Sequence, residues 1–152
     1  MSNHHQLDVS RVIDADPQRL FEAWTDPQMI VQWWGAGGIT CPTAEVDLSV
    51  GGTYRIANEA PDGSVMWITG TFSRVEPPAA LAYTWAMEPV EPHTPVSLVE
   101  VTFSPQADGT LVTVRQTEIP SAEAREMHLD GWRGCLEGLE RVVRTSSAPR
   151  RN

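Results

Sequence analysis

The strongest constraint on the fold is a long amphipathic helix predicted at the carboxyl end of the chain. Pro120 and Ser121 open it, and it continues for roughly six turns to about Arg144. One stripe along this helix advances by four, three, four and three residues and consists of His128, Trp132, Cys135, Leu139 and Val142. A second apolar row lies beside it and consists of Leu129, Leu136 and Val143. So broad an apolar face predicts that the helix covers a large partner surface.

That surface is predicted in the middle of the chain, where β-type runs alternate with turns. The runs are EVDLSV, GGTYRIANE, VMWITGTFSRV, LAYTWAM, VSLVEVTFS and TLVTVRQTEI, separated by turns such as Pro61-Asp62-Gly63 and Ala107-Asp108-Gly109. Alternate positions are apolar, as in Val99, Val101 and Phe103, which indicates antiparallel strands with one covered face. We expect the carboxyl-terminal helix to lie on that face.

Three further elements are predicted before these strands. Residues 6–14 read as a strand, and the dipeptides Asp16-Pro17 and Asp26-Pro27 each provide the capping carboxylate and first-turn proline that start a helix. The order predicts an α+β fold in one domain over residues 1–144, followed by a flexible polar tail over residues 145–152.

Charge and residue types exclude several function classes. The formal net charge is −9, which disfavours nucleic acid and anionic membrane surfaces, and all 11 basic residues are arginine, so lysine chemistry is excluded. Cys41 and Cys135 are far apart, and no His or Cys pair has the spacing of metal ligands. We therefore expect no metal, no cofactor and no membrane insertion, and a reduced, cytoplasmic protein of bacterial type with no signal peptide.

The stretch WWGAGG at residues 33–38 requires an explanation of its own. A dinucleotide-binding pattern fails because Thr40 stands at the third glycine position, and because the glycines follow a helix and do not precede one. We expect Gly35 to end that helix in a left-handed conformation. Trp33 and Trp34 then either line the mouth of an apolar cavity or seal the helix onto the sheet.

Several blocks resemble a known family. The runs FEAWTDPQMIVQWWG, VDLSVGGTYRI, GTFSRVEPPAALAYTW, VEVTFSPQADGTLVTV and MHLDGWRGCLEGLERVV, spread over residues 8–144, are similar to the activator of heat-shock-protein-90 ATPase homologues. That family lies in the START-like, polyketide-cyclase-like (SRPBCC) superfamily. The resemblance implies a helix-grip fold, in which a curved antiparallel sheet wraps around the long carboxyl-terminal helix and encloses a hydrophobic cavity. It does not identify a ligand, because the superfamily includes lipid carriers, hormone receptors, cyclases and co-chaperone domains.

The candidate ligand-binding residues are bulky, aromatic or hydrogen-bonding side chains that could face this cavity. They are Trp33, Trp34, Tyr54, Trp67, Tyr83, Trp85, Gln116, His128, Trp132 and Cys135. His128 and Tyr83 are also candidates for proton transfer. Each has a structural alternative: the aromatic rings could fill the core, Cys135 could be a small buried apolar residue, and Gln116 and Asn58 could be solvated near strand ends.

Three functions remain open from the sequence. The first is a binding protein, acting as carrier, sensor or sequestering module, for a small hydrophobic molecule, including aromatic ones. The second is a cofactor-free enzyme of cyclase or aromatase type that uses the same cavity. The third is a co-chaperone-like module that acts on a heat-shock-protein-90-type ATPase in a stress response, and a chaperone partner and a homodimer both remain open.

Overall fold

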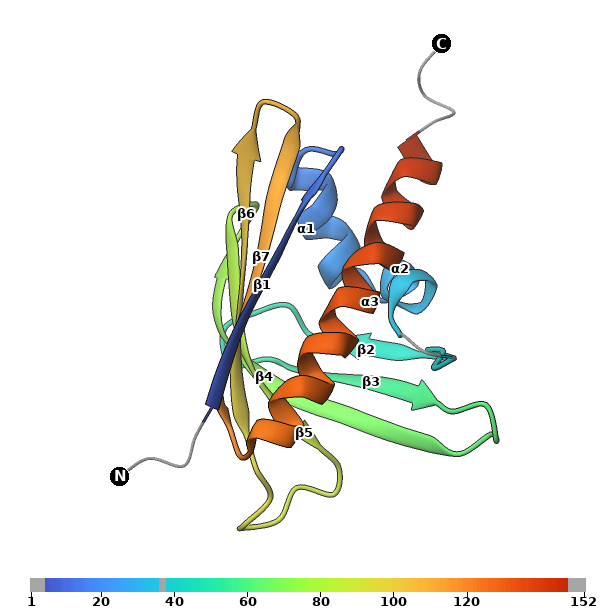
Figure 1. Ribbon diagram of the computed structural model, residues 1–152, viewed down its shortest axis with the longest axis vertical. Helices are drawn as coiled ribbons and strands as arrows, with labels where there is room; N and C mark the ends of the chain where they lie inside the picture. The colour runs from blue at the N-terminus through green and yellow to red at the C-terminus, as the bar shows by residue number, and fades with distance from the viewer. Residues whose placement is uncertain (1–4, 36–37, 148–152) are drawn as a thin grey trace.

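The computed structural model describes residues 5–35 and 38–147 (Figure 1). The elements follow in the order β1 (His5–Ile13), α1 (Pro17–Thr25), α2 (Pro27–Trp33), β2 (Ala44–Val46), β3 (Thr53–Glu59), β4 (Val65–Glu76), β5 (Ala80–Met87), β6 (Ser97–Gln106), β7 (Gly109–Ile119) and α3 (Ala122–Ser147). None of the helices within these ranges has the length and apolar character needed to cross a membrane.

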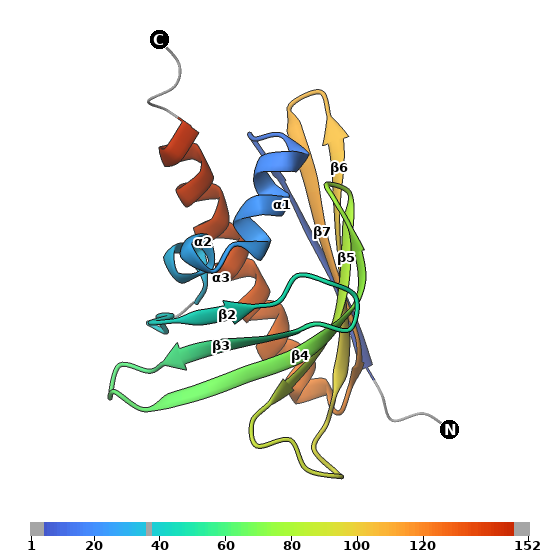
Figure 2. The same cartoon turned by 180° about the vertical axis from the view of Figure 1, so that it is seen from behind.

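The described strands form one antiparallel sheet of seven strands in the order β1-β7-β6-β5-β4-β3-β2. Figures 1 and 2 show this sheet curving around α3, with α1 and α2 beside α3 on the same side. The outer strand β1 pairs with β7, so that His5 lies opposite Ile119 and Ile13 opposite Thr110. The predicted α+β helix-grip architecture is confirmed.

Part of the curvature comes from a bulge in β4. Between Phe72 and Arg74 the strand has one more residue than its partner, where Tyr83 and Ala82 of β5 are adjacent. A bulge of this kind bends the strand and increases its twist. Phe72 and Tyr83 lie opposite each other beside the bulge, with ring centroids 5.8 Å apart.

Both predicted helix starts are confirmed. The Asp16 carboxylate accepts a hydrogen bond from the backbone N–H of Arg19 at 2.8 Å, and the Asp26 carboxylate accepts one from Gln28 at 2.9 Å. After α2, Gly35 has a φ of +114°, and a Cβ there would lie 2.2 Å from the Ile39 carbonyl oxygen. Glycine is therefore required at this helix end, as predicted, while Ala36 and Gly37 lie outside the described residues.

The interior stripe of α3 is formed largely as predicted. Leu136, Leu139 and Val143 are fully buried against the core, whereas Val142 is only half-buried. Gly138 brings α3 against α2, because a Cβ at this position would lie 2.6 Å from the Trp33 carbonyl oxygen. The helix continues to Ser147, three residues beyond the predicted end at Arg144, and residues 148–152 of the predicted tail lie outside the described residues.

One predicted strand is much shorter than expected. The run EVDLSV was expected to be extended throughout, but β2 ends at Val46. The chain then turns back on itself, with the Ser49 N–H donating to the Asp47 carbonyl and the Gly52 N–H donating to the Ser49 carbonyl. Gly51 has a φ of +88°, so the glycine pair favours a turn over a continued strand.

Candidate functional site

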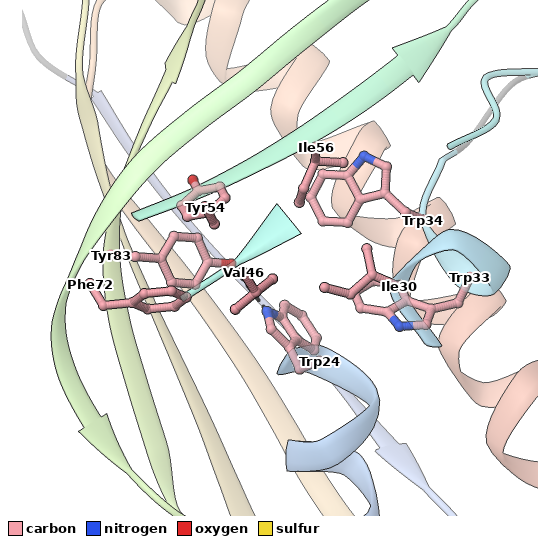
Figure 3. A pocket seen from close by; sticks show the side chains of 9 residues that line it. All are labelled: Trp24, Ile30, Trp33, Trp34, Val46, Tyr54, Ile56, Phe72 and Tyr83. Carbon is pink, nitrogen blue, oxygen red and sulfur yellow. Dashed lines mark hydrogen bonds between the residues drawn. The ribbon is translucent and has the colours of Figure 1, made fainter. Parts of the chain in front are cut away.

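Within the described part of the chain, two neighbouring hollows lie between the sheet and the helices. The first, here called the inner pocket, has a volume of about 20 Å³. Its lining comes from α1, α2 and four strands: Trp24, Ile30, Trp33, Trp34, Val46, Tyr54, Ile56, Phe72 and Tyr83 (Figure 3). A space of this size holds about one water-sized atom.

The second, here called the outer hollow, has a volume of about 170 Å³. It lies between the first half of α3, the chain after α2 and strands β3 to β5, and its lining residues are Trp34, Gly35, Ile39, Asn58, Ile68, Trp85, Met127, His128, Gly131, Trp132 and Cys135. Met127 is 69% exposed, so this hollow has a solvent-accessible rim. It contains five of the ten residues predicted from the sequence to bind a ligand.

The indole of Trp34 separates the two hollows, since it lines both of them. Its Nε1 donates a 2.9 Å hydrogen bond to the side-chain oxygen of Asn58. The ring stands edge-on to Trp132, with centroids 5.7 Å apart and an interplanar angle of 86°. We therefore refer to this side chain as the partition.

Trp33, the neighbour of Trp34, is part of the core. It is 2% exposed, and its Nε1 donates a 2.8 Å hydrogen bond to the Ala23 carbonyl oxygen. The structure thus places the two tryptophans differently: Trp33 seals α2 against α1 and reaches the inner pocket, while Trp34 is half-buried and reaches both hollows.

Tyr54 and Tyr83 face inward from adjacent parts of the curved sheet, with ring centroids 5.2 Å apart. The Tyr54 hydroxyl donates to the Thr84 carbonyl oxygen at 2.6 Å, whereas the Tyr83 hydroxyl accepts from Nε1 of Trp24 at 3.1 Å. Burial raises the pKa of both phenols, so both remain protonated at neutral pH. Neither phenol therefore brings a negative charge to the site.

Gln116 does not line either hollow. It is 0% exposed, its Oε1 accepts a 2.8 Å hydrogen bond from Nε1 of Trp132, and its Nε2 donates to the Ser97 hydroxyl at 2.8 Å. The alternative of solvation near the strand end is therefore wrong, because α3 and β6 cover this part of β7. Its contribution to the site is to hold Trp132 in place.

Trp67 was expected near the cavity, but it lies on the other face of the sheet. Its neighbour Ile68 points inward and is 6% exposed, and successive side chains on a strand alternate between faces. The guanidinium of Arg55, which is paired with Glu88 at 2.8 Å, lies 3.9 Å from the centroid of the Trp67 ring. Trp85 is two residues from the inward-facing Tyr83, and it does line the outer hollow.

His128 lies at the edge of the outer hollow on α3. Its ring packs edge-to-face on Trp85, with centroids 4.6 Å apart, and burial lowers its pKa. The imidazole is therefore neutral at pH 7, with one nitrogen that donates and one that accepts. Neither nitrogen is hydrogen-bonded to another residue in the described ranges, so both are available to a ligand.

Cys135 forms part of the buried wall of the outer hollow. It is 5% exposed, and burial raises the pKa of its thiol to about 11. The burial agrees with the alternative that Cys135 is a small apolar residue. The raised pKa gives the thiol little nucleophilic character. Among residues 5–35 and 38–147, no group of three or more His, Cys, Asp or Glu side chains is placed to hold a metal ion.

Sequence reasoning missed several lining residues. The largest is Trp24, which was not among the candidate residues, and Asn58 was considered but attributed to solvent. A signal for Asn58 was present, because it lies on the same strand face as Tyr54 and Ile56. Ile39, Met127 and the other aliphatic lining residues carried no distinguishing signal.

A curved antiparallel sheet that holds a long carboxyl-terminal helix on its concave side, with aromatic-lined space between them, defines a helix-grip protein. The family model described as "Activator of Hsp90 ATPase homolog 1-like protein" matches residues 14–144, and the chain belongs to this family. The family match therefore confirms the resemblance that the sequence blocks indicated.

Solved structures agree with this assignment. The AHSA1-like protein from Aeromonas hydrophila is 26% identical, with a TM-score of 0.79, and the match covers 94% of each chain. A protein from Chromobacterium violaceum is 25% identical, with a TM-score of 0.81 over 91% of this chain and 96% of the other. The AHSA1 protein from Silicibacter pomeroyi shares the fold, with 22% identity and a TM-score of 0.83 over 93% of this chain and 99% of that one. No curated protein matches the chain.

Proposed function

We propose that this protein binds a small, uncharged hydrophobic molecule in the outer hollow. The observation that carries this proposal is the composition of the walls. Three indoles, from Trp34, Trp85 and Trp132, face a hollow that is otherwise lined largely by apolar side chains, and Asn58 and His128 add isolated polar groups. Apolar walls with a few fixed polar groups are typical of small-molecule sites.

The volume of the outer hollow indicates the size of the ligand. An engineered apolar cavity of about 150 Å³ in another protein binds benzene. The outer hollow has about 170 Å³, so it accepts roughly one aromatic ring without rearrangement. A larger ligand requires the partition or the exposed Met127 to move.

The charges around the site favour a neutral ligand. With His128 neutral, no described residue that lines the outer hollow carries a charge. The chain as a whole has a formal net charge of −9, which disfavours an anion. A carboxylate or phosphate would therefore lose its hydration without gaining a cationic partner.

The geometry favours binding over proton-transfer catalysis. A catalytic base is generally oriented by a second group, such as a carboxylate or carbonyl that holds one ring nitrogen. No described residue hydrogen-bonds to either ring nitrogen of His128, whose ring packs on Trp85, and no described carboxylate lines either hollow. His128 is therefore better suited to hydrogen-bond a ligand than to exchange protons with it.

A pair of leucine variants tests the site directly. Gly131 faces the hollow, and a Cβ there would have no atom beyond its chain neighbours and the α3 backbone within 4 Å, so Gly131→Leu should keep the fold and fill the hollow. The adjacent Asp130→Leu is the matched control, since the Asp130 side chain is 81% exposed.

The probe is fluorobenzene, followed by fluorine NMR during titration. The parent protein and Asp130→Leu should show the same saturable shift, and Gly131→Leu should bind about ten-fold more weakly or worse. Circular dichroism melting curves verify that both variants are folded. Unsaturable shifts in the parent, or equal binding by folded Gly131→Leu, would contradict the proposal.

A further inference from the structure

The inner pocket contains one hydrogen-bond donor that no described residue uses. The Tyr83 hydroxyl oxygen accepts from Trp24, but its own proton has no acceptor among the residues of the described ranges. The side chain is 5% exposed, so bulk water does not supply one. A buried donor without an acceptor is unfavourable, and such groups often mark sites completed by another molecule.

The second tyrosine of the pocket provides an internal comparison. Figure 3 shows the Tyr83 hydroxyl directed toward Trp24 inside the pocket, whereas the Tyr54 hydroxyl is turned away from it. The Tyr54 proton is donated to the Thr84 carbonyl oxygen at 2.6 Å. The two phenols thus share one apolar pocket, but only Tyr83 has a donor to offer.

A water molecule is a poor partner for this donor. The pocket volume of about 20 Å³ admits one water-sized atom, yet the remaining lining is aromatic and aliphatic. Buried waters commonly make about three hydrogen bonds, and here the Tyr83 hydroxyl is the only side-chain donor of the described lining that is unused. An oxygen atom covalently attached to an apolar molecule fits the site better, because its other contacts need no hydrogen bonds.

We propose that the inner pocket is a subsite for the carbonyl oxygen of a neutral, ring-sized ketone or related carbonyl compound, which accepts a hydrogen bond from the Tyr83 hydroxyl. This inference rests on the proposed binding function and adds the chemical class of the ligand. A carboxylate is disfavoured because the described lining contains no cation, and a pure hydrocarbon leaves the donor unsatisfied.

The partition controls access to this subsite. Trp34 is the residue that both hollows share at the boundary between them, and one hydrogen bond, to Asn58, fixes its indole. A ligand that enters the outer hollow reaches Tyr83 when this indole turns aside. The ligand ring then occupies the space between α3 and the sheet, with its oxygen at the inner end.

The experiment compares two probes of nearly equal shape, 4-fluoroacetophenone and 1-ethyl-4-fluorobenzene, by fluorine NMR titration. The measured quantity is the ratio of their affinities. Tyr83→Phe should lower the affinity for the ketone about five-fold relative to the hydrocarbon, because one hydrogen bond is lost. Tyr54→Phe is the matched control and should leave the ratio unchanged, since its hydroxyl bonds to the backbone.

A second variant tests access. Trp34→Ala joins the two hollows, so the ratio should rise in favour of the ketone, and this gain should disappear in the Trp34→Ala/Tyr83→Phe double variant. Binding of both probes with a ratio unaffected by Tyr83→Phe would overturn this inference and leave the proposed function intact. Failure of both probes and of fluorobenzene to bind the parent would overturn the proposed function, and this inference with it.

Discussion

The indole nitrogen of Trp132 on α3 donates a 2.8 Å hydrogen bond to the side-chain oxygen of Gln116 on β7, and both side chains are buried. Gln116 in turn donates to the Ser97 hydroxyl of β6. These two bonds connect the wall of the outer hollow to strands β7 and β6 of the sheet. The orientation of Trp132 in the hollow is thus fixed by polar contacts behind it.

Replacing Gln116 should destabilise the protein. Gln116→Leu leaves the Trp132 N–H without an acceptor in a buried position, which should reduce the free energy of unfolding by about 1–3 kcal/mol. Urea denaturation measures this change, and the exposed Gln106→Leu, expected to cost less than about 0.5 kcal/mol, is the matched control. In a Trp132→Phe background the cost of Gln116→Leu should shrink, and equal costs in the two backgrounds would show that the bond contributes nothing.

Two glycines on the same helix should respond to alanine in opposite ways. Gly131 faces open space, so Gly131→Ala should stabilise the protein by up to about 1 kcal/mol through helix propensity. A Cβ at Gly138 would lie 2.6 Å from the Trp33 carbonyl oxygen, so Gly138→Ala should destabilise by more than about 1 kcal/mol. Thermal and chemical denaturation compare the pair. A stabilising Gly138→Ala would indicate that α2 and α3 do not pack closely enough at Gly138 to exclude a methyl group.

His128 should make stability depend on pH in the mildly acidic range. Burial lowers its pKa below the ordinary value of 6.5, so the unfolded chain binds this proton more readily than the folded protein. Stability should therefore be lost as the pH falls through 6.5 toward the folded pKa, and His128→Gln should remove this part of the loss. NMR titration of the imidazole gives the pKa directly, and a midpoint above 6.5 would contradict the prediction.

The two thiols should be unreactive in the folded protein. Cys41 and Cys135 are free and buried, and burial raises the pKa of each, that of Cys135 to about 11. Iodoacetamide should modify both slowly at mildly alkaline pH and rapidly in concentrated urea. Mass spectrometry after timed quenching counts the modified sites. Rapid labelling of native Cys135 would mean that the outer hollow opens far enough to expose its wall.

The sequence was sufficient for the fold because its strongest signals are local. Asp16-Pro17 and Asp26-Pro27 determine helix starts through a carboxylate and a fixed φ, and both were predicted correctly. The apolar alternation of β6 and β7 and the stripe on α3 required only the geometric periods of strand and helix. Turns were harder, and Gly51-Gly52 ended β2 earlier than the apolar pattern indicated.

The site was predicted less well because it depends on which face each side chain occupies and on what lies opposite. Trp67 and Trp85 look alike in sequence, yet one stacks against Arg55 on the outer face and the other lines the outer hollow. Gln116 was chosen for its polarity, but its partner, Trp132, is supplied by an element with no local relation to it. Trp34 divides the cavity because of how its side chain packs against other elements, and no periodic pattern in the sequence predicts such packing.

The pairing of β1 with β7 also determines when the sheet can be completed. His5 lies opposite Ile119, so strands that are neighbours in space are separated by most of the domain in sequence. Contacts of such long sequence separation slow folding, and domains dominated by them fold on the order of milliseconds to seconds. During synthesis β1 has no partner until β7 emerges, and until then its backbone edge is open to pairing with another chain. The first strand of the sheet to be synthesised, β1, is therefore among the last to be paired. The nascent chain is most vulnerable to aggregation just before the β6–β7 hairpin and α3 form.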